Sequence, residues 1–313
     1  MTEVETIIQG APNPVGRRKL VIRRFLRNKV SVAALIVLAL VFVAAFVLPH
    51  FVPYSYTDMD PDLNQKLKPP SSKHWFGTTL SGEDVLAQTL HGLQKSLIIG
   101  FCAAFLSAVI ATIAGSLAGL LGGWTDRAIM WLVDLLLVIP SFIMIALFAP
   151  KTKGNSSLLL LTVLIAFFGW MISARIIRGL SMSLREREFV RAARYMGAST
   201  WTVITTHVVP NIASILIIDT TLAVGGAVMA ETGLSFLGFG VQPPDISLGS
   251  LIGRYSSSAL NYPWTFVFSG AFLVTIVLCT NLIGDGLRDA FDPSAKRARA
   301  KQRGKRADRK AEA

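Results

Sequence analysis

The chain has 313 residues, of which 52% are hydrophobic and only 16% are charged. A water-soluble domain of this length needs more polar surface to cover its core, so composition excludes an ordinary soluble protein. The net charge of +12 does not indicate nucleic-acid binding, because the basic residues lie between long apolar runs and at both ends of the chain. Several runs reach the length of about 20 residues that crosses the hydrocarbon core of a membrane.

Six transmembrane helices are predicted from these apolar runs. The first run follows a basic segment and is not followed by a small-x-small cleavage pattern, which indicates a retained anchor and not a signal peptide. The length of the runs favours helices, since a barrel strand needs only about 10 residues. In chain order the predicted spans are Val30–Leu48, Ser96–Leu121, Ala128–Ala149, Leu158–Ala174, Ile212–Ala230 and Trp264–Gly284.

The orientation is predicted from Lys and Arg, which accumulate in cytoplasmic loops. With a cytoplasmic N-terminus, 24 of the 31 basic residues lie inside and 7 lie outside. We therefore predict an all-α integral protein of the inner (plasma) membrane with both termini cytoplasmic. Its predicted parts are a basic segment (1–29), a first span with an outward loop (30–95), a core of five spans (96–290) with a cytoplasmic loop at 175–211, and a basic, disordered tail (291–313) that is attracted to anionic lipid.

The cytoplasmic loop carries the most informative pattern. Basic side chains recur at helical spacing on one face: Arg187, Arg191 and Arg194. Apolar side chains share another face: Phe189, Ala193 and Met196. Gly197 then permits a bend, Ser199 is placed to cap a second helix, and Pro210 is expected to end it. The pattern alone fits either a docking element for another protein or an amphipathic connector on lipid headgroups.

Two acidic residues within the predicted spans are candidates for functional roles, because an unpaired charge in a membrane costs at least about 2.5 kcal/mol. Asp134 lies seven residues after Arg127, near the same face of one helix, so we expect an ion pair or an interhelical hydrogen bond in preference to substrate contact. Asp219 lies midway along the fifth span beside Thr220 and Thr221, where it faces a pore or a partner helix.

No catalytic or metal-binding residues are predicted. The chain lacks the Gly-x-x-x-x-Gly-Lys-Ser/Thr pattern that cradles nucleotide phosphates, and it lacks His-Glu-x-x-His. Uphill transport by this chain would therefore need energy from a separate ATPase subunit.

The loop resembles the EAA loop of ABC importer permeases. Ala192, Ala193 and Gly197 match that pattern, whereas Arg191 stands where the family has glutamate; Glu188, one turn earlier, could take its place. Ala198 continues the match. The resemblance implies that this loop is the coupling helix, which sits in a groove of the ATPase subunit.

Three further segments resemble the dipeptide, oligopeptide and nickel branch of these permeases, in the form of its second or C-type subunit. They are His74–Leu86, Ser235–Pro244 and Asn281–Pro293, although Thr79 and Glu83 depart from the pattern. The resemblance implies the type I importer fold and alternating access. It also implies a second permease subunit, two ATPase subunits or one fused ATPase that use ATP and Mg²⁺, and an extracytoplasmic binding protein, with no cofactor held by this chain.

Three functions follow as hypotheses. The first is the pore subunit of an ATP-driven importer of di- or oligopeptides. The second is a nickel or other small-solute permease of the same branch. The third, from another class, is a membrane scaffold or channel that works without ATP.

Overall fold

The computed structural model describes residues 17–59, 66–148 and 155–292, and these residues form helices without any named strand. The N-terminal residues 1–16 and the predicted tail from 293 onward lie outside the described residues. The helices are α2 (Arg17–Phe25), α3 (Lys29–Phe46), α4 (Val85–Leu121), α5 (Gly123–Val138), α6 (Ser141–Phe148), α7 (Asn155–Gly169), α8 (Met171–Arg185), α9 (Glu188–Tyr195), α10 (Thr200–Val203), α11 (Val209–Phe236), α12 (Leu248–Tyr255) and α13 (Trp264–Phe291), with 3₁₀ turns at Leu48–His50 and Ser256–Ser258 and a π-helical turn at Ile204–Val208.

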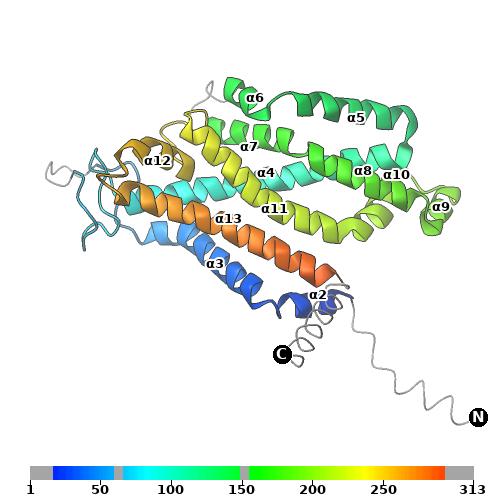
Figure 1. The fold of residues 1–313 in the computed structure, drawn as a ribbon, viewed down its shortest axis with the longest axis horizontal. Helices are drawn as coiled ribbons and strands as arrows, with labels where there is room; N and C mark the ends of the chain where they lie inside the picture. Colours follow the sequence, from blue (N-terminus) through cyan, green and yellow to red (C-terminus); the bar gives the residue numbers. More distant parts are fainter. Residues whose placement is uncertain (1–16, 60–65, 149–154, 293–313) are drawn as a thin grey trace, which may run out of the picture.

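The long helices run along one axis of the molecule (Figure 1). One end carries α12 and the loop that follows α3, and we call it the α12 end. The other end carries α9, α10 and α2, and we call it the α9 end. Helix α4 packs against α7, α8 and α11, while α13 packs between α11 and α3, so that α4 and α11 form the centre of the bundle.

Four helices are long and apolar enough to cross a membrane, and two bent helix pairs raise the number to six. The pairs are α5 with α6, bent by 79° next to Pro140, and α7 with α8, bent by 43° next to Trp170. Each of the six predicted spans lies on one of these six units. The end of the third predicted span, Ala149, lies outside the described residues.

Several helices are longer than the spans predicted from hydropathy. Helix α4 begins at Val85, where the carboxylate of Asp84 accepts a hydrogen bond from the Ala87 amide (2.7 Å). Helix α8 continues to Arg185 and α13 to Phe291. The hydropathy of a segment marks the part that lies in lipid, whereas the helix continues into polar surroundings as long as its backbone bonds are formed.

Small residues let α4 approach α8 closely. A Cβ atom on Gly115 would lie 2.6 Å from the Ala174 carbonyl oxygen, and one on Gly119 would lie 2.6 Å from the Arg178 carbonyl oxygen. One turn earlier, Ser107 donates a hydrogen bond to the Ala166 carbonyl oxygen across the helix contact (2.9 Å). Such a row of small residues at every fourth position is typical of tightly packed membrane helices.

The glycines of the segment Asn281–Pro293 have the same role on α13. A Cβ atom on Gly284 would lie 2.5 Å from the Leu222 side chain of α11, and one on Gly286 would lie 2.1 Å from the Ser31 hydroxyl of α3. Ser31 also donates a hydrogen bond to the Leu282 carbonyl oxygen (2.8 Å). The segment therefore holds the first span against the core.

Candidate coupling site

Helix α9 and the turn that follows it form the outermost part of the α9 end. The helix begins with Glu188, whose carboxylate favours the positive end of the helix dipole. Val190 and Ala193 are buried and face the core, where Val190 packs with the cluster formed by α4, α8 and the π-helical turn. The helix thus has one face fixed to the bundle and another free of contacts within the described chain.

Gly197 ends α9 in a left-handed conformation (φ +86°). Two backbone hydrogen bonds close the turn, from the Gly197 amide to the Arg194 carbonyl (2.9 Å) and from the Ala198 amide to the Ala193 carbonyl (3.0 Å). This pair of bonds defines a Schellman turn, in which glycine is preferred because a Cβ atom disfavours positive φ. No neighbouring atom lies near the position of a Cβ atom, so the backbone conformation alone explains glycine here.

The predicted second helix exists, but it does not end at Pro210. The Ser199 hydroxyl accepts a hydrogen bond from the Thr202 amide (3.1 Å) and caps α10, as predicted. Helix α10 then passes through the π-helical turn directly into α11, giving one helical unit from Thr200 to Phe236. Pro210 lies in the first turn of α11, where the missing amide hydrogen is best tolerated.

Four large side chains around this turn are exposed in the chain alone. The exposed fractions are 45% for Phe189, 82% for Tyr195, 82% for Met196 and 57% for Trp201. The predicted apolar face of Phe189, Ala193 and Met196 is therefore wrong as an inward face, because only Ala193 is buried. Met196 lies beyond the last helical residue, and Val190 takes the inward position one turn before Ala193.

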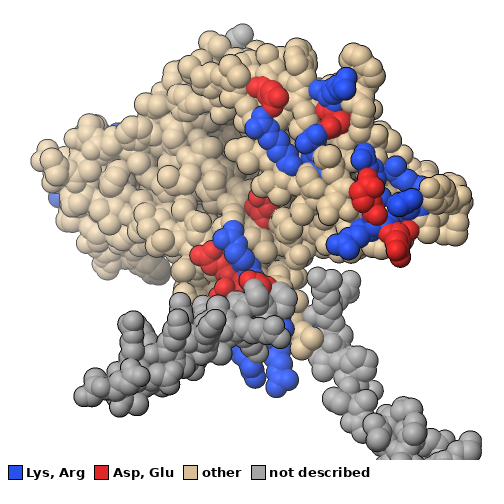
Figure 2. All heavy atoms as spheres, turned by 45° about the vertical axis from the view of Figure 1, so that its right-hand side comes forward, with Lys and Arg blue, Asp and Glu red and all other residues tan. Residues whose placement is uncertain are grey.

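The remaining residues of the predicted coupling loop lie on or near this surface. Glu188, Arg191, Ala192 and Gly197 are exposed, and Ala198 is half-buried against the core. Arg194 turns toward the bundle and donates a hydrogen bond to the Leu120 carbonyl at the end of α4 (3.0 Å). Figure 2 shows Lys, Arg, Asp and Glu side chains gathered over the end of the molecule that carries α9, beside a broad uncharged surface.

The two charges predicted on the third span do not pair with each other. Asp134 forms an ion pair with Arg175 of α8, while Arg127 is exposed. A second contact between the same helices joins Asp126 to Arg178, whose Nη2 donates to Oδ2 (2.6 Å). The predicted interhelical role of Asp134 is thus confirmed with a different partner, which lies 41 residues away in the sequence.

Asp219 faces α8 from α11. Its Oδ2 atom accepts a hydrogen bond from the Ser173 hydroxyl (2.6 Å), and its side chain is half-buried. It does not line the largest apolar groove of the described chain, which lies on another side of α11. Its role in a transport pathway stays a prediction.

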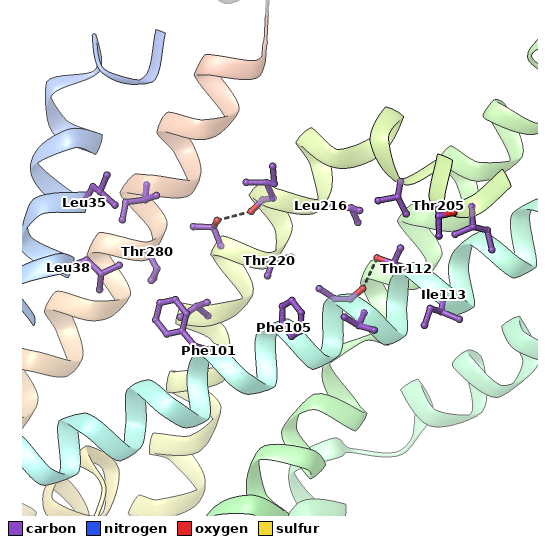
Figure 3. Close-up of a pocket in the computed structure, with 18 of the residues that line it drawn as sticks. Leu35, Leu38, Phe101, Phe105, Thr112, Ile113, Thr205, Leu216, Thr220 and Thr280 are labelled. Carbon is purple, nitrogen blue, oxygen red and sulfur yellow. Dashed lines mark hydrogen bonds between the residues drawn. The ribbon is translucent and has the colours of Figure 1, made fainter. Parts of the chain in front are cut away.

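That groove has a volume of about 720 Å³ and lies between α3, α4, α11 and α13, with Trp201 and Ile204 at the α9 end (Figure 3). The groove is apolar although five threonines line it. Four of their hydroxyls donate to carbonyl oxygens on their own helices, at 2.7 to 3.0 Å: Thr112, Thr205, Thr221 and Thr280. The walls therefore present methyl groups and aromatic rings to whatever occupies the groove.

Sequence reasoning missed Glu231, which is fully buried near the α12 end of α11. Its carboxylate accepts hydrogen bonds from the hydroxyls of Ser96 on α4 (3.0 Å) and Ser235 (2.6 Å). Ser96 in turn accepts the amide of Leu248 at the start of α12 (3.1 Å), and Ser235 accepts the hydroxyl of Ser247 (3.2 Å). One carboxylate thus connects α4, α11 and α12.

The turn after α11 repeats the chemistry of the Gly197 turn. Gly238 has φ +83°, and the amides of Gly238 and Phe239 bond to the carbonyls of Ser235 (3.0 Å) and Leu234 (2.8 Å). Here the turn is closely packed, because a Cβ atom on Gly240 would lie 1.8 Å from the Ser235 hydroxyl. The segment Ser235–Pro244 therefore folds back onto the serines that hold Glu231.

The comparison with family models decides which family this fold and loop represent. Residues 111–297 match the binding-protein-dependent transport system inner membrane component, and residues 17–70 match the N-terminal transmembrane domain of oligopeptide transport permease C. The chain belongs to this permease family. The resemblance found in the loop and in the three further segments is thereby confirmed, and the chain is an inner-membrane permease subunit of an ABC importer.

Relatives extend over nearly the whole permease. The oligopeptide transport system permease protein OppC of Mycobacterium tuberculosis is 58% identical over 283 residues, which cover 90% of this chain and 97% of the relative. A putative peptide permease of Brucella suis is 39% identical (92% and 94% covered), and OppC of Haemophilus influenzae is 37% identical (87% and 86% covered).

A solved structure supports the predicted type I importer fold of the permease. A chain of the MetNI methionine ABC transporter in an inward-facing conformation superposes with a TM-score of 0.51 at 20% sequence identity. The match covers 64% of this permease and 95% of the MetNI chain, so the fold extends through the core and leaves additional residues in this permease.

Proposed function

We propose that this permease forms half of the pore of an ATP-driven importer of oligopeptides and that an ATPase subunit grips its α9 end. The substrate class is taken from relatives that carry the name of oligopeptide permeases over most of both chains. The partners are a second homologous permease, two ATPase subunits or one fused ATPase, and an extracytoplasmic binding protein at the α12 end.

The observation that carries this proposal is the surface around Gly197. Tyr195 and Met196 are each 82% exposed, and Arg187 and Arg191 beside them are exposed as well. Exposed aromatic, methionine and arginine side chains are enriched in protein interfaces. The inner face of the same helix is fixed by Val190 and by the bond of Arg194 to α4, so a force on this surface is passed to the bundle.

Helix α11 offers the path for this force. The helical unit from Thr200 to Phe236 begins two residues after the Gly197 turn and reaches the α12 end. There Glu231 connects it to α4 and α12 through serine hydroxyls. A displacement of the α9 end would tilt this rod and move the α12 end with it, which is the motion that alternating access requires.

ATP drives such a cycle only through its different affinity for the two arrangements of the transporter. In the proposed cycle, ATP and Mg²⁺ bind the ATPase subunits, whose closure moves the α9 surface and opens the pathway outward. Hydrolysis returns the pore to the inward-facing arrangement. This permease supplies no catalytic residue, no metal ligand and no bound cofactor in this scheme.

The α9 end is assigned to the cytoplasm, together with both termini. The support is the excess of Lys and Arg on this side, 24 of 31 in the predicted topology. ATPase subunits work in the cytoplasm, so this orientation is also the one that lets α9 reach them.

The ion pair of Asp134 and Arg175 supports a second permease beside α5 and α8. Both residues lie near the bends of their helix pairs, midway between the ends of the spans, yet their side chains are 62% and 49% exposed. Charges at this depth are rarely left facing lipid and face a partner or a water-filled pathway instead. We propose that the partner permease covers this face, with Asp219 and Arg127 as further candidates for the pathway or for helix contacts.

The test is peptide uptake by cells that carry the chain with Gly197→Val. Valine disfavours positive φ, so the α9 surface should be misplaced and uptake lost while the protein still inserts into the membrane. The control is Gly179→Val, because Gly179 also has open space around it but lies within α8 at an ordinary φ. Uptake unchanged by Gly197→Val would contradict the proposal.

Two alternatives are separated by further assays. Growth on peptides compared with growth under nickel scarcity distinguishes peptide import from nickel import within the same branch. Transport that persists after ATP depletion, from a complex without an ATPase, would favour a channel or scaffold.

A further inference from the structure

The short helix α2 lies at the boundary of the membrane. It ends at Phe25, and the spanning helix α3 begins at Lys29, capped by the Asn28 side chain. Only three residues separate the two helices, so α2 stays close to the level at which α3 enters the membrane. Figure 1 places α2 at the α9 end of the molecule, next to the end of α13.

One side of α2 is fixed to the core. Phe25 packs with Leu287 of α13 in the apolar cluster that also holds α3. The Arg24 guanidinium donates a hydrogen bond to the Ala290 carbonyl near the end of α13 (3.4 Å). Gly286 leaves the space for this contact, since a Cβ atom there would lie 3.2 Å from the Phe25 ring.

The other side of α2 combines two rows of exposed side chains. An apolar row one helical turn apart consists of Ile22 and Leu26, which are 59% and 60% exposed. A basic row beside it, also at intervals of four residues, consists of Lys19, Arg23 and Arg27, all exposed. The sequence of α2 contains no acidic residue that could neutralise this row.

We propose that this surface of α2 binds anionic phospholipids at the α9 side of the membrane. The apolar row would enter the boundary between headgroups and acyl chains, while the basic row would bind the phosphate groups. Each basic side chain near an anionic surface contributes about 1 kcal/mol, or about fivefold in affinity. A protein partner on this surface would have to bring acidic groups and an apolar cleft together, whereas the membrane that α3 enters supplies both.

The binding surface is separate from the coupling site. The α9 surface is built on α4 and α8, whereas α2 is attached to α13 and α3. The inference needs only that α3 spans the membrane, and it is independent of the proposed substrate and of the ATPase contact.

The experiment is hydrogen exchange on the full chain reconstituted in vesicles of phosphatidylcholine, with and without phosphatidylglycerol. Backbone amides of residues 19–27 should be protected at least about fivefold more in the anionic vesicles. Arg23→Gln with Arg27→Gln should remove this difference. Arg23→Lys with Arg27→Lys keeps the charges and should preserve it, which separates loss of charge from loss of folding. The matched control is Lys66→Gln with Lys68→Gln, which removes two exposed charges outside α2 and should leave the protection unchanged.

Equal protection of the wild type in both kinds of vesicle would overturn the proposal. So would protection that arises only when the ATPase subunits are added, since the surface would then bind a protein. Protection that depends on phosphatidylglycerol but survives the glutamine variant would also contradict it, because the basic row would then have no part in the binding.

Discussion

The two ends of the bundle use the same glycine turn in opposite ways. At the α9 end, the Schellman turn at Gly197 stands in open space, with Tyr195 and Met196 exposed beside it. At the α12 end, the Schellman turn at Gly238 leads back onto Ser235 and the buried Glu231. A turn of one geometry therefore serves one end as a surface for a partner and the other as an internal lock. The environment of the turn, and not its backbone, indicates the role.

The lock at the α12 end should give the largest effect on stability. Glu231→Leu leaves the hydroxyls of Ser96 and Ser235 buried without their acceptor, at a cost of about 3 kcal/mol or more. The melting temperature of the purified protein should fall by roughly 6–12 °C. Glu231→Gln keeps one oxygen acceptor and should cost less, and the exposed Glu186→Gln serves as the control with no effect. An unchanged melting temperature in the leucine variant would show that the carboxylate does not connect the three helices.

Midway between the two ends, Asp134→Asn should leave Arg175 unpaired within the membrane, at a cost of about 2.5 kcal/mol. The expected result is less of the second permease in the purified complex. The double variant Asp134→Asn with Arg175→Gln removes both charges and should recover part of the yield. Equal yields for the single and double variants would mean that the unpaired charge is not the cause.

The comparison of the two turns is sharpest in a pair of alanine variants. Gly240→Ala would place a Cβ atom 1.8 Å from the Ser235 hydroxyl, so we expect about 2 kcal/mol of destabilisation from overpacking. Gly197→Ala meets no neighbouring atom and costs about 1 kcal/mol through its positive φ alone. Thermal unfolding of both variants checks the order. A larger effect at Gly197 would contradict the difference in packing between the ends.

The smallest expected effect concerns Asp219. Asp219→Asn retains an oxygen that can accept the hydrogen bond of Ser173, so the melting temperature should stay unchanged. If the charge faces the pathway, peptide uptake should fall by about tenfold, or about 1.4 kcal/mol. Ser173→Ala is the control, since it removes the donor and keeps the charge. Full uptake by the asparagine variant would assign Asp219 to helix contact alone.

Much of the fold could be predicted because lipid imposes a strong pattern on sequence. Each predicted span lies on a helical unit, and the bend near Gly197 and the Ser199 cap follow from local rules. The helix ends could not be placed from hydropathy, since α4 extends 11 residues before the predicted Ser96. Asp84 followed by an apolar helical pattern is the signal that could have located this start.

The contacts of the charged residues lay beyond sequence reasoning. Asp134 pairs with Arg175, and Glu231 with Ser96, 135 residues earlier in the chain. No local spacing brings such residues together, because they meet only when α4, α8 and α11 pack. Glu231 was missed for a second reason, since it lies one residue beyond the predicted span and so looked like part of a polar loop.

The account depends most on the side of the membrane at which the α9 surface lies. The direct measurement is labelling of Met196→Cys by a thiol reagent that does not cross the membrane, in a background with Cys102→Ser, since Cys102 is exposed. Leu260→Cys, 98% exposed in the segment before α13, is the matched site at the α12 end. In intact cells the account predicts labelling at position 260 and none at position 196, with the reverse in inside-out vesicles. Labelling of position 196 from outside intact cells would place the coupling surface away from any ATPase and contradict the account.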